Sequence, residues 1–221
     1  MKILDKPFDG VIFDMDGLIL DNGIMYRSAY QNAAQAQGFS ISRELYSHLL
    51  GLPHAVCDDI LQDTFGSEFS VEKFTQAWKQ EYHAALERDG VRLRDGFEEL
   101  FAHLEAHQIP VGLATSSDFQ KADLLLGRSR YLKAVNAVST VDDIQRGKPD
   151  PEIYLTTAKK LNLRPGKAIV FEDANNGMRA AIAAGCLGVM VPNQAPPDED
   201  VKQQALLILS SLKEAIPLII T

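Results

Sequence analysis

Short apolar runs that alternate with longer helical stretches constrain the fold of this 221-residue chain more than any other feature. The runs are rich in β-branched residues, which suits strands that are buried on both faces. Between them, apolar residues recur at helical spacing, as at Phe97, Leu100 and Leu104. The alternation predicts an α/β fold, with a parallel sheet covered by helices on both faces. The expected strands are residues 11–13, 110–114, 134–138, 168–171 and 187–191.

Residues 22–89 break this alternation because they carry helical patterns alone. A helical block of that size after the first strand predicts a small inserted domain. We therefore expect a core made of residues 1–21 and 90–221, with residues 22–89 as a helical insertion. The helices expected in the insertion are 24–37, 43–50, 55–65 and 71–88.

Several helix boundaries are marked by residue types that suit helix ends. Asp95 and Glu98 have the spacing of a capping box. Asp150 followed by Pro151 offers a cap and then proline at the first helical position. Residues 205–220 are expected to add a last edge strand and a short helix.

Polar residues follow three of the expected strands at the point where each strand ends. In open parallel sheets this edge is where ligands bind. Four carboxylates gathered there need a counter-charge, and oxygen ligands without His or Cys favour Mg²⁺. The residues are Asp14 and Asp16 after the first strand, Thr115 and Ser116 after the second, and Glu172 and Asp173 after the fourth.

These residue types suit phosphoryl transfer. Asp14 could attack phosphorus in line, and Asp16 could protonate the leaving oxygen and then deprotonate water. Lys148 supplies a positive charge for phosphate or a carboxylate, and Thr115 and Ser116 supply donors for phosphoryl oxygens. The sequence predicts a phosphohydrolase that acts on a small phosphate ester.

Composition argues against several kinds of partner. The net charge is −8 and no run of Lys and Arg occurs, so we expect neither a nucleic-acid surface nor a membrane surface. The N-terminus has no apolar stretch of signal-peptide length, and Cys57 and Cys186 are far apart, so we expect a cytoplasmic protein with two free thiols. Nothing in the sequence indicates an oligomeric state.

Four segments together resemble the haloacid dehalogenase superfamily, in its branch of phosphatases and β-phosphoglucomutase-like proteins. The segments are FDMDGLILD, LATSS, GKPDPEIY and VFEDANNGMRAAIAAG. The resemblance spans the whole chain and has all four motifs in order. It implies a Rossmann-like core, a C1-type α-helical cap inserted after the first strand, and dependence on Mg²⁺.

The resemblance also implies a role for each matching residue. Asp14 matches the nucleophile, Asp16 the general acid and base, and Lys148 the lysine of the third motif. Thr115 matches the phosphate-binding hydroxyl and is followed by Ser116. The implied metal ligands are Asp14, the backbone oxygen of Asp16, Asp173, and Glu172 acting through a metal-bound water.

Departures from other members favour a phosphatase. Dehalogenases lack the second aspartate, which is present here as Asp16, and no cap lysine is well placed for phosphonate cleavage. The β-phosphoglucomutases carry a histidine, a lysine and an arginine in the cap, where this chain has Tyr26, Leu50 and His54. A phosphosugar mutase remains the alternative. Specificity is expected from the cap residues Tyr26, Leu50, Leu52 and His54.

Two non-hydrolytic classes are disfavoured. A nucleotide-binding module would be expected to carry GxxxxGK[ST] or GxGxxG, and neither pattern occurs. A binding protein that had kept the fold but lost the chemistry would be expected to lack the catalytic aspartates, which are present.

Overall fold

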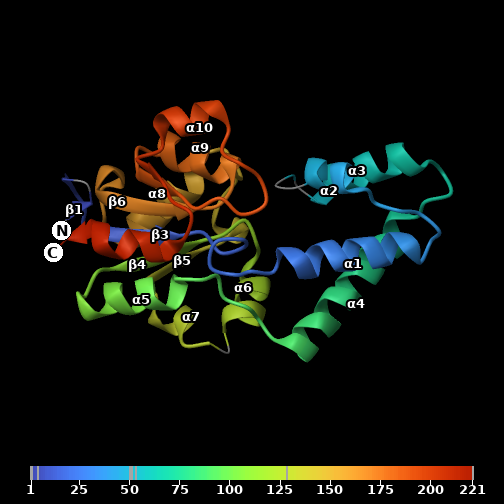
Figure 1. Cartoon of the computed structure of the whole chain (residues 1–221), viewed down its shortest axis with the longest axis horizontal. Coiled ribbons are helices and arrows are strands. Elements are labelled where there is room, and N and C mark those ends of the chain that lie inside the picture. Colours follow the sequence, from blue (N-terminus) through green and yellow to red (C-terminus); the bar gives the residue numbers. More distant parts are fainter. Residues whose placement is uncertain (1, 4, 50–51, 53, 128, 221) are drawn as a thin grey trace. The chain divides into compact units, whose positions relative to one another are not determined.

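A computed structural model describes residues 2–3, 5–49, 52, 54–127 and 129–220 (Figure 1). The chain divides into two compact units. One consists of Met1–Asp21 and Leu93–Thr221, and the other of Asn22–Arg92. We call them the sheet unit and the helical unit, and each is described by itself.

The sheet unit is built on a six-stranded sheet with the order β5-β4-β3-β6-β7-β8. All its strand pairs are parallel. This confirms the predicted α/β fold class. The strands are β3 (Gly10–Phe13), β4 (Val111–Ala114), β5 (Ala137–Ser139), β6 (Ala168–Glu172), β7 (Leu187–Met190) and β8 (Leu207–Ile208).

Helices cover both faces of this sheet (Figure 1). One face carries α8 (Glu152–Lys160) and α9 (Asn175–Ala183), with α10 (Glu199–Gln204) packed on α9. The other carries α5 (Phe97–Ala106), α6 (Phe119–Leu126) and α7 (Tyr131–Ala134). Because strands buried on both faces need apolar side chains, β3 and β4 are continuous apolar runs, and β6 is apolar up to its last residue, Glu172.

Successive residues of β3 point to opposite faces and fill two separate cores. Ile12 belongs to the core under α8 and α9, together with Tyr154 and Met178. Phe13 faces α5, where its ring stacks on Phe171 at 5.2 Å and meets Phe97 edge-on at 5.6 Å.

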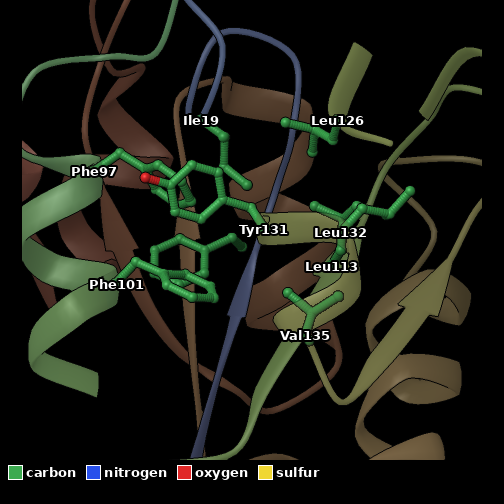
Figure 2. Close-up of a pocket in the computed structure, with 10 residues that line it drawn as sticks. Ile19, Phe97, Phe101, Leu113, Leu126, Tyr131, Leu132 and Val135 are labelled. Atoms are coloured by element: carbon green, nitrogen blue, oxygen red, sulfur yellow. The ribbon is translucent and has the colours of Figure 1, made fainter. Parts of the chain in front are cut away.

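Figure 2 shows a pocket in this second core, between the aromatic rings of α5 and α7 and the strands. Its walls include Ile19, Phe97, Phe101, Leu113 and Tyr131. Its volume is about 10 Å³, which is room for one water molecule at most. The pocket is a packing gap in the core and is too small for a substrate.

The chain leaves and re-enters the sheet unit at adjacent points. Leu20 and Leu93 form an antiparallel bridge, and the amide of Arg94 donates to the carbonyl of Ile19 at 2.8 Å. These contacts hold the two connecting segments beside the loop that follows β3.

The helical unit contains α1 (Gly23–Gln35), α2 (Arg43–Leu49), α3 (His54–Phe65) and α4 (Val71–Asp89). Its core is aromatic: the ring of Tyr30 lies 5.1 Å from Phe74 and 5.2 Å from Trp78. The Ser70 side chain caps α4 by accepting a hydrogen bond from the amide of Lys73. The four helices expected from the sequence are all present, with ends shifted by at most two residues.

Three expected boundaries are wrong. Pro151, expected at the first helical position, is itself the N-cap residue, and α8 begins at Glu152. The strand expected at 134–138 is only in part a strand, because Ala134 ends α7, whose Tyr131 is buried against Phe101, and β5 begins at Ala137. The Asp95–Glu98 capping box does not form, because α5 begins after Gly96 and has no side-chain cap. Gly96 has a φ of 82° and a Cβ there would collide with the backbone of Lys213. This close contact, and not a cap, fixes the start of α5.

The N-terminus and the tail form a second, small sheet that the sequence pattern did not predict. It has the order β2-β1-β9 and is antiparallel. Its strands are β1 (Lys2–Ile3), β2 (Lys6–Pro7) and β9 (Ile219–Ile220). The predicted edge strand and short helix of the tail are β8 and the 3₁₀ helix η3 (Leu212–Leu218). The other 3₁₀ helices are η1 (Val141–Asp143) and η2 (Pro165–Lys167). No helix in the described ranges is both long enough and apolar enough to cross a membrane.

Candidate active site

Three neighbouring strands carry the polar residues predicted for the site. β3 is central and is followed by Asp14, β4 beside it is followed by Thr115, and β6 on the other side ends in Glu172 and is followed by Asp173. The parallel register aligns Phe13 with Leu113 and Phe171, so the three strands end at the same level. The sheet thereby brings residues from distant parts of the sequence to one edge.

A buried lysine links two of these carboxylates. Lys148 Nζ lies 2.5 Å from Asp14 Oδ1 and 2.6 Å from Glu172 Oε1. All three side chains are at least nine-tenths buried. Burial opposes the charge on Lys148, yet the Asp14 and Glu172 carboxylates raise its pKa well above its ordinary value. Lys148 therefore stays protonated and supplies one positive charge to the site.

Glu172 is held by four donors. Its Oε1 accepts from Lys148 and from Tyr154 Oη at 2.7 Å, and its Oε2 accepts the amides of Asp173 at 2.9 Å and Ala174 at 3.0 Å. Gly177 in α9 allows this arrangement, because a Cβ at that position would overlap the Glu172 carboxylate. The carboxylate is thus fixed from the strand, from α8 and from the start of α9.

Asp14, Glu172 and Asp173 form a cluster of three carboxylates whose ligand atoms lie within 4.8 Å of one another. Burial raises the pKa of Asp14 from its ordinary 3.8 to about 8, Lys148 opposes the rise, and Glu172 adds to it. Burial also raises the pKa of Asp173 well above its ordinary value, with further contributions from Glu172 and Asp14. One lysine does not balance three carboxylates, of which Asp14 and Glu172 are buried and Asp173 is half-buried. The cluster therefore fits a divalent cation with oxygen ligands, such as Mg²⁺.

The backbone at Gly17 closes one side of this cluster. Gly17 has a φ of 92°, and a Cβ there would collide with Asp173 Oδ2. Its carbonyl accepts from Arg94 Nη1 at 2.7 Å and from Asn193 Nδ2 at 3.0 Å. These bonds tie the loop after β3 to the segment after β7, next to Asp173.

Asp16 points to a different set of partners from Asp14. Its Oδ2 accepts from Ser117 Oγ at 2.7 Å and from Lys121 Nζ at 3.1 Å. The Asp16 and Lys121 side chains are 28% and 27% exposed, whereas Asp14 is buried. The two aspartates of the DxD segment therefore have the separate environments that two different chemical roles require.

Thr115 is buried and Ser116 is exposed. The Thr115 amide donates to the carbonyl of Ser139, and its Oγ1 accepts the amide of Ser117 at 3.0 Å. This turn presents hydroxyl and amide groups at the end of β4.

The predicted specificity residues belong to the helical unit. The ring of Tyr26 stacks on Tyr82 with centroids 4.2 Å apart, and Leu52 is half-buried. Leu50 lies outside the described residues. His54 is the first residue of α3, and its side chain also lies outside what the structure describes.

Sequence reasoning did not identify Tyr154, Lys121, Arg94 or Asn193. Tyr154 stands at the end of the quoted segment GKPDPEIY, and its position six residues after Lys148, about one helical turn into α8, is the signal that could have indicated it. Arg94 and Asn193 act through backbone carbonyls, which leave no pattern in a sequence.

Known proteins are similar to this chain in sequence and in fold. The family model described as haloacid dehalogenase-like hydrolase matches residues 11–191. A phosphorylated carbohydrates phosphatase from Thermotoga maritima is 32% identical over 80% of this chain and 82% of its own length. A beta-phosphoglucomutase from Bacillus subtilis is 30% identical over 92% and 93%. The chain also resembles the crystal structure of a HAD hydrolase, family IA, variant 3, from Entamoeba histolytica, with a TM-score of 0.79 and 23% identity. The match covers 96% of this chain and 99% of that chain, so the two proteins have the same fold. The chain belongs to the haloacid dehalogenase-like hydrolase family.

Proposed function

We propose that this protein is a magnesium-dependent phosphomonoesterase that hydrolyses a small phosphorylated carbohydrate or a similar metabolite through an aspartyl-phosphate intermediate. The observation that carries the proposal is the cluster of Asp14, Glu172 and Asp173 at the ends of β3 and β6, together with the buried Lys148 that contacts Asp14 and Glu172. Its carboxylates suit a hard cation, and Asp14 within it is the acceptor of the phosphoryl group.

Asp14 acts as the nucleophile. One of its carboxylate oxygens attacks phosphorus while the bond from phosphorus to the leaving oxygen breaks. Lys148 lies 2.5 Å from Asp14 Oδ1, so it fixes the orientation of this carboxylate and offsets part of the negative charge around it. Tyr154 and Glu172 hold Lys148 in place from the other side.

Asp14, Asp173 and the backbone oxygen of Asp16 would hold Mg²⁺ directly, and Glu172 would do so through a water molecule. The four donors already bound to the Glu172 carboxylate support this indirect role. When bound, the ion neutralises charge between the carboxylate and the phosphoryl oxygens. Asp14 and Asp173 can then both be ionised despite their burial.

Asp16 acts as the general acid and base. It gives a proton to the leaving oxygen in the first step and takes one from the attacking water in the second. Thr115 and Ser116 donate to the phosphoryl oxygens from the end of β4. The exposure of Asp16, in contrast to Asp14, supports its access to the leaving group and to water.

The helical unit is proposed to act as the cap of the sheet unit, with residues 22–89 as the insertion and 1–21 and 90–221 as the catalytic core. Tyr26, Leu50, Leu52 and His54 are the residues proposed to select the leaving group. The division of the chain at Asn22 and Arg92 supports this assignment. The proposed substrate class is supported by the Thermotoga maritima relative, whose name states that it acts on phosphorylated carbohydrates.

A phosphosugar mutase is the second candidate. It is supported by the Bacillus subtilis relative named beta-phosphoglucomutase, which is 30% identical over nearly the whole chain. The presence of Tyr26 where the mutases carry a cap histidine favours hydrolysis, because a stacked tyrosine cannot supply the positive charge that a second phosphate would need.

The test is a panel of phosphorylated sugars, sugar alcohols and nucleosides, assayed with Mg²⁺ and with EDTA. We expect Mg²⁺-dependent release of inorganic phosphate from at least one sugar phosphate, and its loss in Asp14→Asn. Interconversion of sugar 1- and 6-phosphates faster than phosphate release would favour the mutase. Activity that persists in EDTA or in pure Asp14→Asn protein would contradict the proposal.

A further inference from the structure

Two donors from one loop and helix converge on a single oxygen of Asp16. Ser117 lies in the turn after β4, and Lys121 lies in the first turn of α6. The Ser117 hydroxyl donates to Asp16 Oδ2 at 2.7 Å, and the Lys121 ammonium donates to the same atom at 3.1 Å.

We propose that Ser117 and Lys121 are positioning residues that orient the Asp16 carboxylate toward the leaving-group oxygen. This inference rests on the proposed function, in which Asp16 is the general acid. Two hydrogen bonds to one oxygen restrict both side-chain torsions of the aspartate.

The backbone holds both donors in place. Asp118 is the N-cap of α6, and its Oδ1 accepts a hydrogen bond from the amide of Lys121 at 2.7 Å. The amide of Ser117 donates to Thr115 Oγ1 at 3.0 Å, and its carbonyl accepts from the amide of Val141 at 3.2 Å. One short segment therefore links the proposed phosphate-binding hydroxyl of Thr115 to the groups that hold the acid.

Stability does not explain the ion pair between Lys121 and Asp16. Both side chains are more than a quarter exposed, and pairs of this kind contribute little to folding because solvent screens them. A pair that contributes little to stability but fixes a reacting group is expected to affect catalysis far more than the melting temperature.

The proposed role makes a prediction about leaving groups. In the first step a phosphorus–oxygen bond forms to Asp14, the bond to the leaving oxygen breaks, and the Asp16 proton moves to that oxygen to give a neutral alcohol. A 4-nitrophenol leaving group is acidic and departs without help, whereas an alkyl alcohol needs the proton. Loss of positioning should therefore slow alkyl esters selectively.

The experiment compares kcat/KM for 4-nitrophenyl phosphate and for a neutral alkyl phosphate, because kcat/KM reports steps up to departure of the leaving group. The variants are Lys121→Met, Ser117→Ala and the conservative Lys121→Arg. Lys202→Met is the matched control, since it removes an exposed ion pair with Glu199 in α10. Melting temperatures are measured for all of them.

We expect Lys121→Met and Ser117→Ala to lower kcat/KM for the alkyl ester by about 10- to 100-fold, which is part of the roughly 100- to 10,000-fold that general acid catalysis supplies, and for the aryl ester by less than about threefold. Lys121→Arg should recover most of the loss, and Lys202→Met should match the wild type on both esters. Melting temperatures should change little.

Other outcomes would overturn the inference. An equal loss of kcat/KM for both esters would indicate that Lys121 contacts the phosphoryl group. A loss confined to esters with a second anionic group would indicate that Lys121 binds that group of the substrate. Wild-type rates in Lys121→Met would also contradict it. Asp16→Asn distinguishes a failure of the proposed function from a failure of the inference alone. If this variant shows no preference for the aryl ester, or if the wild type hydrolyses neither ester, the proposed function fails and the inference fails with it.

Discussion

At the scale of single residues, the site depends on Lys148, whose ammonium contacts Asp14 and Glu172 in a region closed to solvent. Its removal leaves two buried carboxylates without their counter-charge, so they must take up protons or remain unpaired. We expect Lys148→Met to lower the free energy of unfolding by about 3 kcal/mol at neutral pH and to lower kcat at least about 100-fold. Urea unfolding and phosphate release measure the two effects.

Lys160→Met is a suitable control for this prediction. Lys160 pairs with Asp143 at 2.8 Å, but both side chains are about one-third exposed. Its loss should cost less than about 1 kcal/mol. Equal destabilisation by the two substitutions would mean that burial of Lys148 does not determine its contribution.

The raised pKa of Asp14 predicts how the stability of the metal-free protein depends on pH. A carboxyl group whose pKa rises from 3.8 to about 8 on folding holds its proton more tightly in the folded state. Its contribution to stability is full below about pH 4 and is lost as pH rises through 8, with a slope of at most about 1.4 kcal/mol per pH unit. In EDTA, the wild type should therefore lose stability between pH 5 and 8 relative to Asp14→Asn, a loss measured by urea unfolding at each pH. Parallel pH profiles for the two proteins would contradict this.

Whether the sequence predicts that a residue belongs to the site depends on what places its side chain there. Asp14, Asp16, Thr115, Glu172 and Asp173 could be located because each ends a strand or lies within three residues after its end, and strand ends meet at one edge. Lys121 and Arg94 could not be located in this way. Their contacts depend on the direction of a long side chain and, for Arg94, on backbone carbonyls, neither of which follows from residue type or spacing.

At the scale of elements, α9 brings its first turn against the Glu172 carboxylate, and Gly177 makes this possible. Glycine to alanine in a helix ordinarily stabilises by up to about 1 kcal/mol. Here the added methyl group would displace Glu172 and its bonds to Lys148 and Tyr154. We expect Gly177→Ala to destabilise the protein and to lower activity, as measured by thermal unfolding and phosphate release.

Gly166→Ala serves as the comparison for Gly177→Ala. A Cβ at Gly166 would meet only the carbonyl oxygen of Gly185, at 3.7 Å. The substitution should leave stability and activity close to the wild type. If Gly177→Ala behaves in the same way, Glu172 is free to shift and its fixed position is not required.

Elements could be predicted where hydrophobic periodicity is strong. The helices of residues 22–89 appear at their expected places because each presents an apolar face, such as Phe74 and Trp78 of α4. Hydrophobic periodicity did not predict elements whose boundaries depend on tertiary contacts, such as the start of α5, which is set by the contact of Gly96 with Lys213. It also did not predict two-residue strands such as β1 and β9, which are too short to show a period.

At the scale of the whole molecule, cation binding should be coupled to folding of the sheet unit, because Asp14 and Asp173 lie on loops after different strands and are brought together only in the folded chain. A ligand that binds the folded state stabilises it by about 2.7 kcal/mol at one hundred times its dissociation constant. We expect Mg²⁺ to raise the melting temperature in a concentration-dependent way.

Asp173→Asn should lose most of this Mg²⁺-dependent rise, because it removes one carboxylate of the cluster. A lysine substitution on the surface, such as Lys202→Met, should keep it. An equal rise in wild type and Asp173→Asn would show that the cation binds elsewhere.

Borohydride trapping tests whether Asp14 carries the phosphoryl group. Borohydride reduces an aspartyl phosphate to homoserine, which mass spectrometry locates within a peptide. The Asp16→Asn variant with Mg²⁺ and 4-nitrophenyl phosphate should accumulate the intermediate, because the aryl group leaves without an acid while hydrolysis lacks its base. We expect homoserine at position 14, and we expect its formation to depend on substrate and Mg²⁺. Turnover without any modification at position 14, or modification at another residue, would contradict it.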